Sequence, residues 1–311
     1  MQVLALTPRG YCHGVVHAIK VLKDLAHDDT VKRPIYVLGM LLHNKKIVDD
    51  FSMLGVHTLH DPKRTRLELL DDIDKGTVVF TAHGVSDHVV EKAKSKNLDI
   101  IDTTCKDVRL SQETIKQYLS DGYTVLFIGK KHHPESETAS SYGNQVHLIE
   151  KINDIETLSL SKEKIAVTNQ TTMSLFDIFN LFEAIKKRYP DAELIEEQCD
   201  ATRSRQLAVM HQPNDIQHCF VVGDKHSNNC TKLVEVALKK GIPSNLINSV
   251  EELDIDYLKT LSKVSVTSGA STPSALTKEV IDYLTSFDNI HPKKPVSTLK
   301  DRNLFKHLKK D

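Results

Sequence analysis

Short apolar runs alternate with amphipathic stretches along most of this chain, and the alternation predicts its fold class. Runs such as 3–6 and 219–222, bounded by polar turn residues, are typical of buried strands. Apolar residues spaced three and four apart indicate one face of a helix. This spacing is clearest at Val15, Ile19 and Leu22. Strands that alternate with helices in this way predict small parallel sheets with crossover connections.

Three cysteines mark a unit that recurs along the chain. Cys12, Cys105 and Cys199 follow one another at nearly equal intervals. Each cysteine comes after an apolar run and before a segment that can be helical, so each is expected at a strand-to-helix turn. Self-similarity at a fixed period is typical of a repeated structural unit.

Two further turns recur in register with the cysteines. A polar turn follows the second strand of each repeat, a threonine-bearing turn follows the third, and another short strand candidate lies between them. Ordinary alternation of strands and helices would produce loose periodicity, but it does not predict three matched features at matched offsets. The polar turns are 43–44, 133–135 and 227–229, the threonine turns are 79–84, 167–172 and 266–271, and the strand candidates are 56–59, 146–149 and 245–247.

The repeats predict an α/β protein in which three similar small parallel-sheet domains form a pseudo-threefold trefoil around a central cavity. The third repeat lacks a clear fourth strand, so the N-terminal strand is expected to complete its sheet. Ligand sites lie beyond the carboxyl ends of parallel strands, which should bring all three cysteines to the cavity. The expected domains are 14–105, 106–199 and 200–288 completed by 1–13, followed by a basic, solvated or frayed tail at 289–311.

Composition excludes several classes of protein. The chain of 311 residues carries 41 Lys and Arg against 42 Asp and Glu, a formal charge of -1, which argues against a general nucleic-acid binder. Membrane association is not expected, since no apolar run approaches a membrane span and the first residues lack a signal-peptide pattern. Five cysteines in so long a chain do not make a disulfide scaffold. We therefore expect a cytoplasmic protein with reduced thiols or metal-bound cysteines.

The three repeated cysteines admit several interpretations. They could be buried thiols, a zinc site, a nucleophile with two bystanders, or ligands of an iron–sulfur cluster. A four-iron cluster ordinarily takes four thiolates, so three ligands leave one iron open to a substrate. Zinc is less favoured because paired C-x-x-C spacing is absent and zinc carries no electrons. Of the other two cysteines, Cys219 fits an apolar strand, and Cys230 in a polar turn is favoured as a neighbour of the site.

The aligned turns are rich in hydrogen-bond donors that suit an anion. Glu135 is the only acid among the turn residues aligned above, so it is the natural proton donor if a C–O bond is cleaved reductively. Any one of these residues alone would more often lie solvated at a surface, and their corresponding positions carry the interpretation. The donors are His43, His83 and His133 together with Ser227, Asn229 and Ser271.

Seven segments resemble the signatures of the 4-hydroxy-3-methylbut-2-enyl diphosphate reductases, the LytB-type enzymes of the non-mevalonate isoprenoid pathway. The resemblance implies a trefoil around a 4Fe-4S cluster and a two-electron, two-proton reductive dehydroxylation to isopentenyl and dimethylallyl diphosphates. It also implies reduced ferredoxin or flavodoxin as electron donor. The segments follow the family's order over about 1–283 and are 8–15, 81–86, 102–105, 133–135, 168–172, 223–229 and 267–271.

The resemblance also assigns roles by position. It implies that Cys12, Cys105 and Cys199 are cluster ligands, that Glu135 relays a proton and that Thr171 orients the substrate hydroxyl. The residues that it implies for diphosphate binding are His43, His83, His133, Ser227, Asn228, Asn229 and Ser271.

Several residues depart from the family pattern. Lys106 stands where proline is usual, and Asp200 stands where a larger or apolar residue is usual, so each places a charge beside a cysteine. These charges motivate a second hypothesis, a paralogue that keeps the fold and cluster but acts as a redox-responsive binding protein. A third is a zinc-dependent or cysteine-nucleophile enzyme. The remaining departures are Val16, Thr138 and Thr231.

Overall fold

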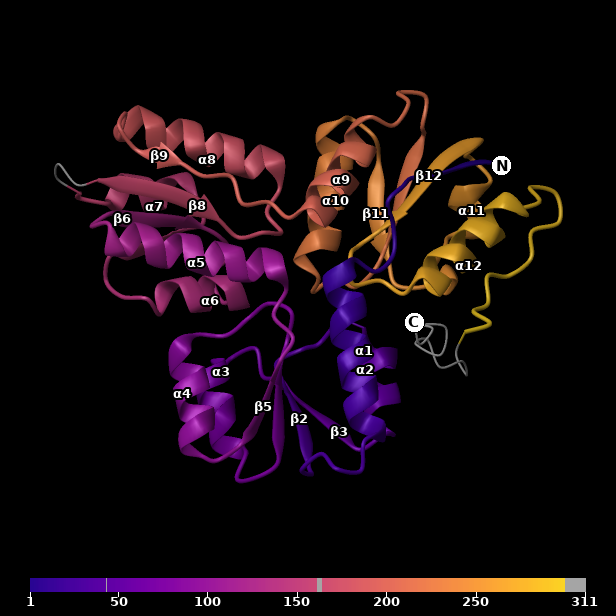
Figure 1. Cartoon of the computed structure of the whole chain (residues 1–311). Helices are drawn as coiled ribbons and strands as arrows, with labels where there is room; N and C mark the ends of the chain where they lie inside the picture. The colour runs from indigo at the N-terminus through magenta and orange to yellow at the C-terminus, as the bar shows by residue number, and fades with distance from the viewer. Residues whose placement is uncertain (43, 161–163, 300–311) are drawn as a thin grey trace. The chain divides into compact units, whose positions relative to one another are not determined.

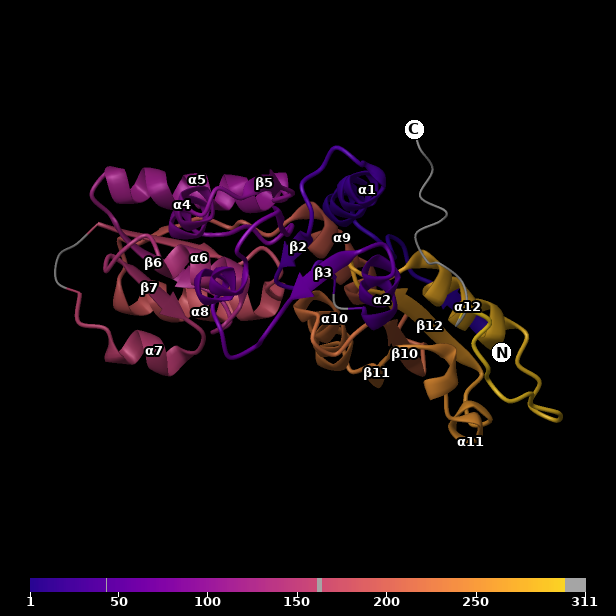
Figure 2. The same cartoon turned by 90° about the horizontal axis from the view of Figure 1, so that it is seen from below.

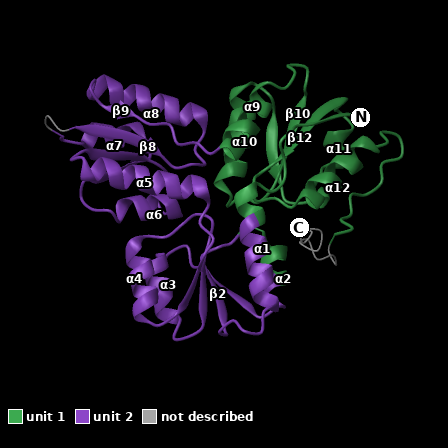
Figure 3. Cartoon of the chain, in the orientation of Figure 1, with its two compact units in different colours: residues 1–16, 42–50, 200–311 green, residues 17–41, 51–199 purple. Residues whose placement is uncertain are grey.

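The computed structural model describes residues 1–42, 44–160 and 164–299, and the chain divides into two compact units. Unit 1 consists of 1–16, 42–50 and 200–311, and unit 2 consists of 17–41 and 51–199 (Figure 3). Among the described residues, every helix is too short or too polar to cross a membrane.

Unit 1 contains one parallel sheet, built from the two ends of the chain. The N-terminal strand β1 lies beside β12, and the strand order is β1-β12-β10-β11 (Figure 1). Apolar side chains of β10 and β12 pack with α12 in one core, since Phe220, Val266 and Val280 are all nearly inaccessible to solvent. The strands are β1 (Gln2–Ala5), β10 (His218–Val222), β11 (Ser244–Ile247) and β12 (Lys263–Ser268), and the helices are α9 (Asp200–Met210), α10 (Asn228–Lys239), η2 (Val250–Glu252), α11 (Ile255–Leu258) and α12 (Ser274–Thr285).

Unit 2 contains two parallel sheets, with strand orders β3-β2-β4-β5 and β7-β6-β8-β9. Their strands are β2 (Ile35–Leu38), β3 (Val56–Leu59), β4 (Thr77–Phe80), β5 (Asp99–Asp102), β6 (Thr124–Ile128), β7 (Val146–Ile149), β8 (Ile165–Asn169) and β9 (Glu193–Leu194). The helices of this part of the chain, of which α1 and α2 begin in unit 1, are α1 (His13–His27), α2 (Lys45–Ser52), α3 (Arg66–Leu69), η1 (Leu70–Asp72), α4 (Asp87–Ser95), α5 (Lys106–Ser120), α6 (Pro134–Ser140), α7 (Ile152–Thr157) and α8 (Leu175–Arg188).

The β6 strand shows how alternation along the sequence produces two cores. Successive side chains of a strand point to opposite faces of the sheet. Val125 and Phe127 pack with helices α5 and α6 on one face. Leu126 and Ile128 pack with α7 and α8 on the other face, and Figure 2 shows these helices from below. A strand covered on both faces must be apolar throughout, which is why β6 appears in the sequence as a continuous apolar run.

The three sheets have the same strand order, which confirms the predicted α/β class with three parallel four-stranded sheets. The first strand after each cysteine (β2, β6 or β10) pairs on one side with the second strand of its repeat, which is an edge strand. On its other side it pairs with the third strand, and the fourth strand forms the opposite edge. The β1–β12 pairing supplies the fourth strand that the third repeat lacks. The boundaries drawn between the repeats and their placement around one cavity stay predictions.

Polar residues that follow the carboxyl ends of the strands are also the N-caps of the next helices. Ser86, Ser174 and Ser227 each accept a hydrogen bond from a backbone N–H of the first turn of α4, α8 and α10. Such caps satisfy donors that an α-helix leaves without a partner. Cys105 and His133 occupy the same N-cap position before α5 and α6. The fold therefore places these candidate site residues at helix N-termini.

A partly buried ion pair ties α3 of the first repeat to α6 of the second within unit 2. Glu137 accepts hydrogen bonds from the Arg66 backbone at 3.0 Å and from its guanidinium at 3.4 Å. The guanidinium lies against Gly39, where an added Cβ would come within 2.9 Å of it and where φ is +91°. Only glycine suits both the conformation and the close approach. Arg66 of the first repeat therefore fixes the position of α6, the helix of the second repeat that carries Glu135.

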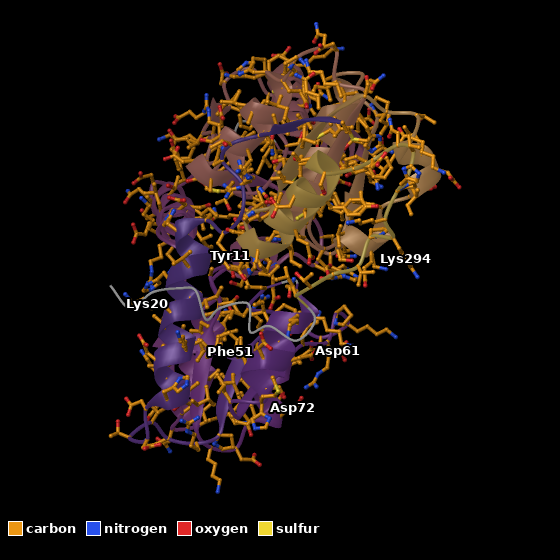
Figure 4. All side chains as sticks on the ribbon, turned by 90° about the vertical axis from the view of Figure 1, so that its right-hand side faces the viewer. Tyr11, Lys20, Phe51, Asp61, Asp72 and Lys294 are labelled. Atoms are coloured by element: carbon orange, nitrogen blue, oxygen red, sulfur yellow. The ribbon has the colours of Figure 1, made fainter. Side chains whose placement is uncertain are left out.

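Two residues labelled in Figure 4 illustrate the contrast between core and surface in the first repeat. Phe51, near the end of α2, is 2 % exposed, whereas Asp72 at the end of η1 pairs with Arg64 at the surface. Surface pairs of this kind contribute little to stability.

Part of the C-terminal segment is hydrogen-bonded to α12. Residues 289–299 contain no helix or strand. Nevertheless Ser297 and Thr298 both bond to the carboxylate of Glu279 on α12, and Leu299 is 8 % exposed. Hydrogen bonds thus hold 297 and 298 to α12, while the solvated or frayed character of the tail at 289–311 stays a prediction, of which 300–311 lies outside the described residues.

Candidate functional site

The carboxyl ends of β6 and β8 bring together Glu135 and Thr171. Glu135 lies in the first turn of α6 and is 5 % exposed, and Thr171 follows β8 and is 3 % exposed. The Thr171 backbone N–H donates to one carboxylate oxygen at 2.8 Å, and its hydroxyl donates to the other at 3.1 Å. Both oxygens are thus oriented by one residue from the neighbouring strand.

Burial raises the pKa of Glu135 from 4.5 to about 7. Desolvation is the main cause, because a carboxylate loses its hydration in an apolar pocket. The two hydrogen bonds from Thr171 lower the pKa and so oppose the shift, while the charge of Glu197 raises it. Near neutral pH the group is therefore close to half protonated, which suits a proton donor.

This shift predicts how stability depends on pH. The folded protein holds the Glu135 proton more tightly than the unfolded chain, so stability should fall as pH rises from 4.5 through about 7. We expect Glu135→Gln to be more stable than the unsubstituted protein at pH 8, by about 3 kcal/mol at ~1.4 kcal/mol per pKa unit. The advantage should vanish below pH 4.5. Melting temperatures of both proteins across this range, measured without oxygen, test the prediction; a difference that is constant with pH would contradict it.

Two histidines lie beside this acid. The rings of His83 and His133 meet edge to face with their centroids 5.6 Å apart. The Nδ1 atom of His133 accepts the backbone N–H of Glu135 at 3.3 Å and lies 4.0 Å from its carboxylate. In the neutral ring an accepting Nδ1 puts the proton on Nε2. The Nε2–H group of His133 is therefore a hydrogen-bond donor on the side of the ring opposite the Glu135 backbone N–H.

Cys105 and Cys199 belong to the same unit as this acid, and both are half-buried. The backbone N–H of Cys105 donates to Ala82 at 3.0 Å, directly before His83. The backbone N–H of Cys199 donates to the Thr171 carbonyl at 3.3 Å. Each cysteine is thus fixed by its main chain to a turn that carries another candidate residue.

In unit 1 the turns after β1, β10 and β12 form a second group of candidate residues. The Cys12 backbone N–H donates to the Ala270 carbonyl at 2.9 Å. The Ala270 N–H in turn donates to the Asn229 side chain at 2.9 Å. The hydroxyl oxygens of Ser227 and Ser271 lie 3.4 Å apart, and Asn228 begins α10 beside them. This unit therefore assembles one cysteine with a set of short neutral donors.

The structure describes all of the predicted site residues except His43, which lies outside the described residues. Unit 2 brings six of them together at the carboxyl ends of its sheets, and unit 1 brings together the remaining five. The six are His83, Cys105, His133, Glu135, Thr171 and Cys199; the five are Cys12, Ser227, Asn228, Asn229 and Ser271.

Glu197 is a further acid at this site, and the aligned turns did not predict it. Its carboxylate oxygen Oε2 accepts hydrogen bonds from the Ser111 hydroxyl at 2.7 Å and from the Thr168 hydroxyl. Its backbone N–H donates to Asn169 at 3.1 Å. Its position two residues before Cys199 could have marked it as a site residue. The turns compared between the repeats did not include the segment between β9 and Cys199. Glu135 is accordingly not the sole acid near the ends of this sheet.

The two charged departures from the family pattern lie at helix starts. Lys106 and Asp200 are the first residues of α5 and α9, and both are exposed. An acid in the first turn is favoured by the helix dipole, whereas a cation there is mildly unfavourable. Asp107 follows Lys106, and its carboxylate lies 3.9 Å from the Cys105 sulfur.

Comparison with known proteins identifies the family. The family model described as LytB protein matches residues 3–285. The chain is 46% identical over 294 residues to "4-hydroxy-3-methylbut-2-enyl diphosphate reductase" of Geobacillus sp. (strain WCH70), covering 94% of this chain and 93% of that one. The protein of the same name from Geobacillus thermodenitrificans (strain NG80-2) is 45% identical over 306 residues, covering 98% of this chain and 95% of its own.

Solved structures agree with this family. The E-1-hydroxy-2-methyl-but-2-enyl-4-diphosphate reductase from Plasmodium falciparum superposes with a TM-score of 0.84 at 29% identity, covering 94% of both chains. A second structure, described as (E)-4-hydroxy-3-methyl-but-2-enyl diphosphate reductase, the terminal enzyme of the non-mevalonate pathway, has a TM-score of 0.64 at 25% identity, covering 91% of this chain and 98% of its own. The chain is therefore an oxidoreductase that belongs to the LytB protein family.

Proposed function

We propose that this protein reduces 4-hydroxy-3-methylbut-2-enyl diphosphate to isopentenyl and dimethylallyl diphosphates, the last step of the non-mevalonate pathway. The relatives named as this reductase support the substrate. The observation that carries the chemistry is the buried carboxyl of Glu135, held by Thr171 with its pKa near 7. The reaction breaks an allylic C–O bond with two electrons and two protons and releases the hydroxyl oxygen as water.

Cys12, Cys105 and Cys199 are proposed to hold a 4Fe-4S cluster. The donor set fits, because each of the three cysteines directly precedes a helix, where the N-terminal dipole favours the thiolate that such clusters require. When bound, the cluster would pass two electrons, one at a time, from the electron donor to the substrate.

Glu135 supplies a proton to the departing hydroxyl oxygen, and Thr171 orients that hydroxyl. The Thr171 side chain can do this because its hydroxyl both donates to Glu135 and keeps lone pairs for another partner. A buried acid that is about half protonated near pH 7 can give up a proton and regain one in each turnover. Glu135 is held in the first turn of a helix and Thr171 comes shortly after the end of a strand, and such fixed positions favour precise transfer.

The residues proposed to bind the diphosphate offer N–H and O–H donors within each unit. His83 and His133 offer ring N–H groups from unit 2. The N-terminus of α10 supports Ser227, Asn228 and Asn229 in unit 1, and helix N-termini favour anions. His43 and Ser271 complete the proposed set.

The wider setting of the reaction also stays a proposal. Reduced ferredoxin or flavodoxin would deliver the electrons, and the protein would act in the cytoplasm. The proposed repeats are 14–105, 106–199 and 200–288 with 1–13, followed by the tail at 289–311.

Anaerobic purification tests the proposed function directly. We expect a brown protein with about four irons per chain that consumes the hydroxylated diphosphate with an artificial reductant. A colourless protein with stoichiometric zinc would contradict the cluster and favour a zinc enzyme. An intact cluster without turnover would favour the redox-responsive binding protein, which the charges of Lys106 and Asp200 motivate.

A further inference from the structure

Glu135 is one of the residues that line a small cavity between α5, β6 and α6. The volume of this cavity is about 10 Å³, and Ser111 and Gln112 of α5 line it together with Glu135 and apolar side chains of α5, β6 and α6. This volume is close to the minimum that one water molecule needs. A water also needs two or more polar partners, so the polar atoms at this cavity decide what it can hold.

Gln112 provides a buried donor without a partner. Its Nε2 atom has no hydrogen-bond partner among the described residues. A Cβ added to Gly84, next to His83, would come within 2.5 Å of this nitrogen, so glycine at that turn is what makes room for the amide. A buried N–H that makes no hydrogen bond is costly, and burial of this amide therefore indicates a bound partner.

Ser111 provides an acceptor at the same cavity. Its hydroxyl donates to Glu197 at 2.7 Å, which fixes the direction of its proton. The hydroxyl oxygen keeps lone pairs for a donor from the cavity. Gln112, Ser111 and Glu135, which carry an amide donor, a hydroxyl acceptor and a carboxyl group, thus all line a space of about one water molecule.

We propose that Gln112 is a positioning residue that, with Ser111, holds a single water molecule against the carboxyl group of Glu135. Gln112 donates to the water oxygen, and the water donates one proton to Ser111 and the other to the carboxylate. The water stabilises the ionised acid in an otherwise apolar pocket after it has given up its proton. The inference deepens the proposed function and rests on the role of Glu135 in it.

Few charges act on Glu135 from the elements around it. Glu197, at the end of β9, raises its pKa by repulsion, and His133 at the start of α6 lies 4.0 Å from its carboxylate. The cavity-lining residues of α5 and β6 are uncharged. Removing the proposed water should therefore change the pKa of Glu135 through loss of a hydrogen bond alone.

The test compares Gln112→Met with Gln117→Met in the holoenzyme. Methionine keeps the length of glutamine and removes the amide, and Gln117 is a surface residue of the same helix bonded to Asp121. Protonation of Glu135 is followed by its carboxylic-acid infrared band, assigned by its absence in Glu135→Gln. We expect Gln112→Met to move the midpoint of this band up by about one pH unit, and the upper limb of the kcat profile with it. Gln117→Met should move neither.

A high-resolution structure of the holoenzyme completes the test. It should show one water in contact with Gln112, Ser111 and Glu135, and Ser111→Ala should raise the same midpoint if Gln112→Met fails to fold. An unmoved midpoint, or a cavity without water in the unsubstituted enzyme, overturns the proposal, and so does lower activity with an unmoved midpoint. Because the infrared titration needs no turnover, its outcome is independent of whether the diphosphate is the substrate.

Discussion

Glu135→Gln is expected to lower kcat by about 10²–10⁴-fold, the usual contribution of a positioned general acid. Glutamine matches glutamate in shape and can still accept the Thr171 backbone N–H and donate to its hydroxyl. The substitution therefore removes the transferable proton while leaving the hydrogen-bonded geometry in place. Steady-state kinetics with the hydroxylated diphosphate, alongside iron content and the absorption spectrum, measure the two effects separately.

An exposed acid in the same repeat provides the control for this prediction. Glu156 lies on the surface of α7, and Glu156→Gln should leave kcat and iron content unchanged. Turnover at the unsubstituted rate in Glu135→Gln would move the proton donor elsewhere, with Glu197, whose charge acts on Glu135, as the next carboxylate to replace. Loss of iron in Glu135→Gln would show instead that the residue supports the cluster site.

Strand positions were the most predictable part of the structure. The candidates 56–59 and 146–149 coincide with β3 (Val56–Leu59) and β7 (Val146–Ile149). Short apolar runs mark these strands, because the crossover helices bury both faces of a parallel sheet and its strands must therefore be apolar. The place of β1 beside β12 also followed from the sequence, since a parallel sheet of fixed order leaves one position for the missing strand.

The contacts between elements were less predictable, because they depend on register and side-chain direction. Thr168 appeared in an aligned turn, yet its bond to Glu197 needs the pairing of β8 with the two-residue β9. Short, exposed β9 has almost no apolar signal of its own. Arg66 and Glu137 are likewise far apart in sequence and meet only through the packing of α3 against α6.

The polar lining of the cavity at Glu135 illustrates the same limit. Ser111 and Gln112 fall within an amphipathic helix, where serine and glutamine usually mark the solvent face. In the structure Ser111 is 4 % exposed, and the amide nitrogen of Gln112 is buried. The spacing of apolar residues shows which face of a helix is mostly buried. It does not show which single polar side chains are buried to make hydrogen bonds.

Replacing any one of the three repeated cysteines with alanine is expected to abolish turnover and most iron binding. Cys12→Ala, Cys105→Ala and Cys199→Ala each leave two thiolates for a cluster that ordinarily takes four, and alanine offers no replacement ligand. The matched controls are Cys219→Ala and Cys230→Ala, since both thiols are fully buried in the core of unit 1. The controls should cost some stability through lost packing and keep iron at the unsubstituted level.

The same series distinguishes a shared cluster from the other interpretations of the cysteines. Iron and zinc per chain, measured after anaerobic reconstitution, should fall together with the cluster absorption in all three variants, because a cluster cannot persist on a partial ligand set. A single nucleophile would instead give one inactive variant and two active ones, all without iron. If one of the three variants retained its full cluster, that cysteine would not be a ligand, and the equivalence inferred from the repeats would be wrong at that position.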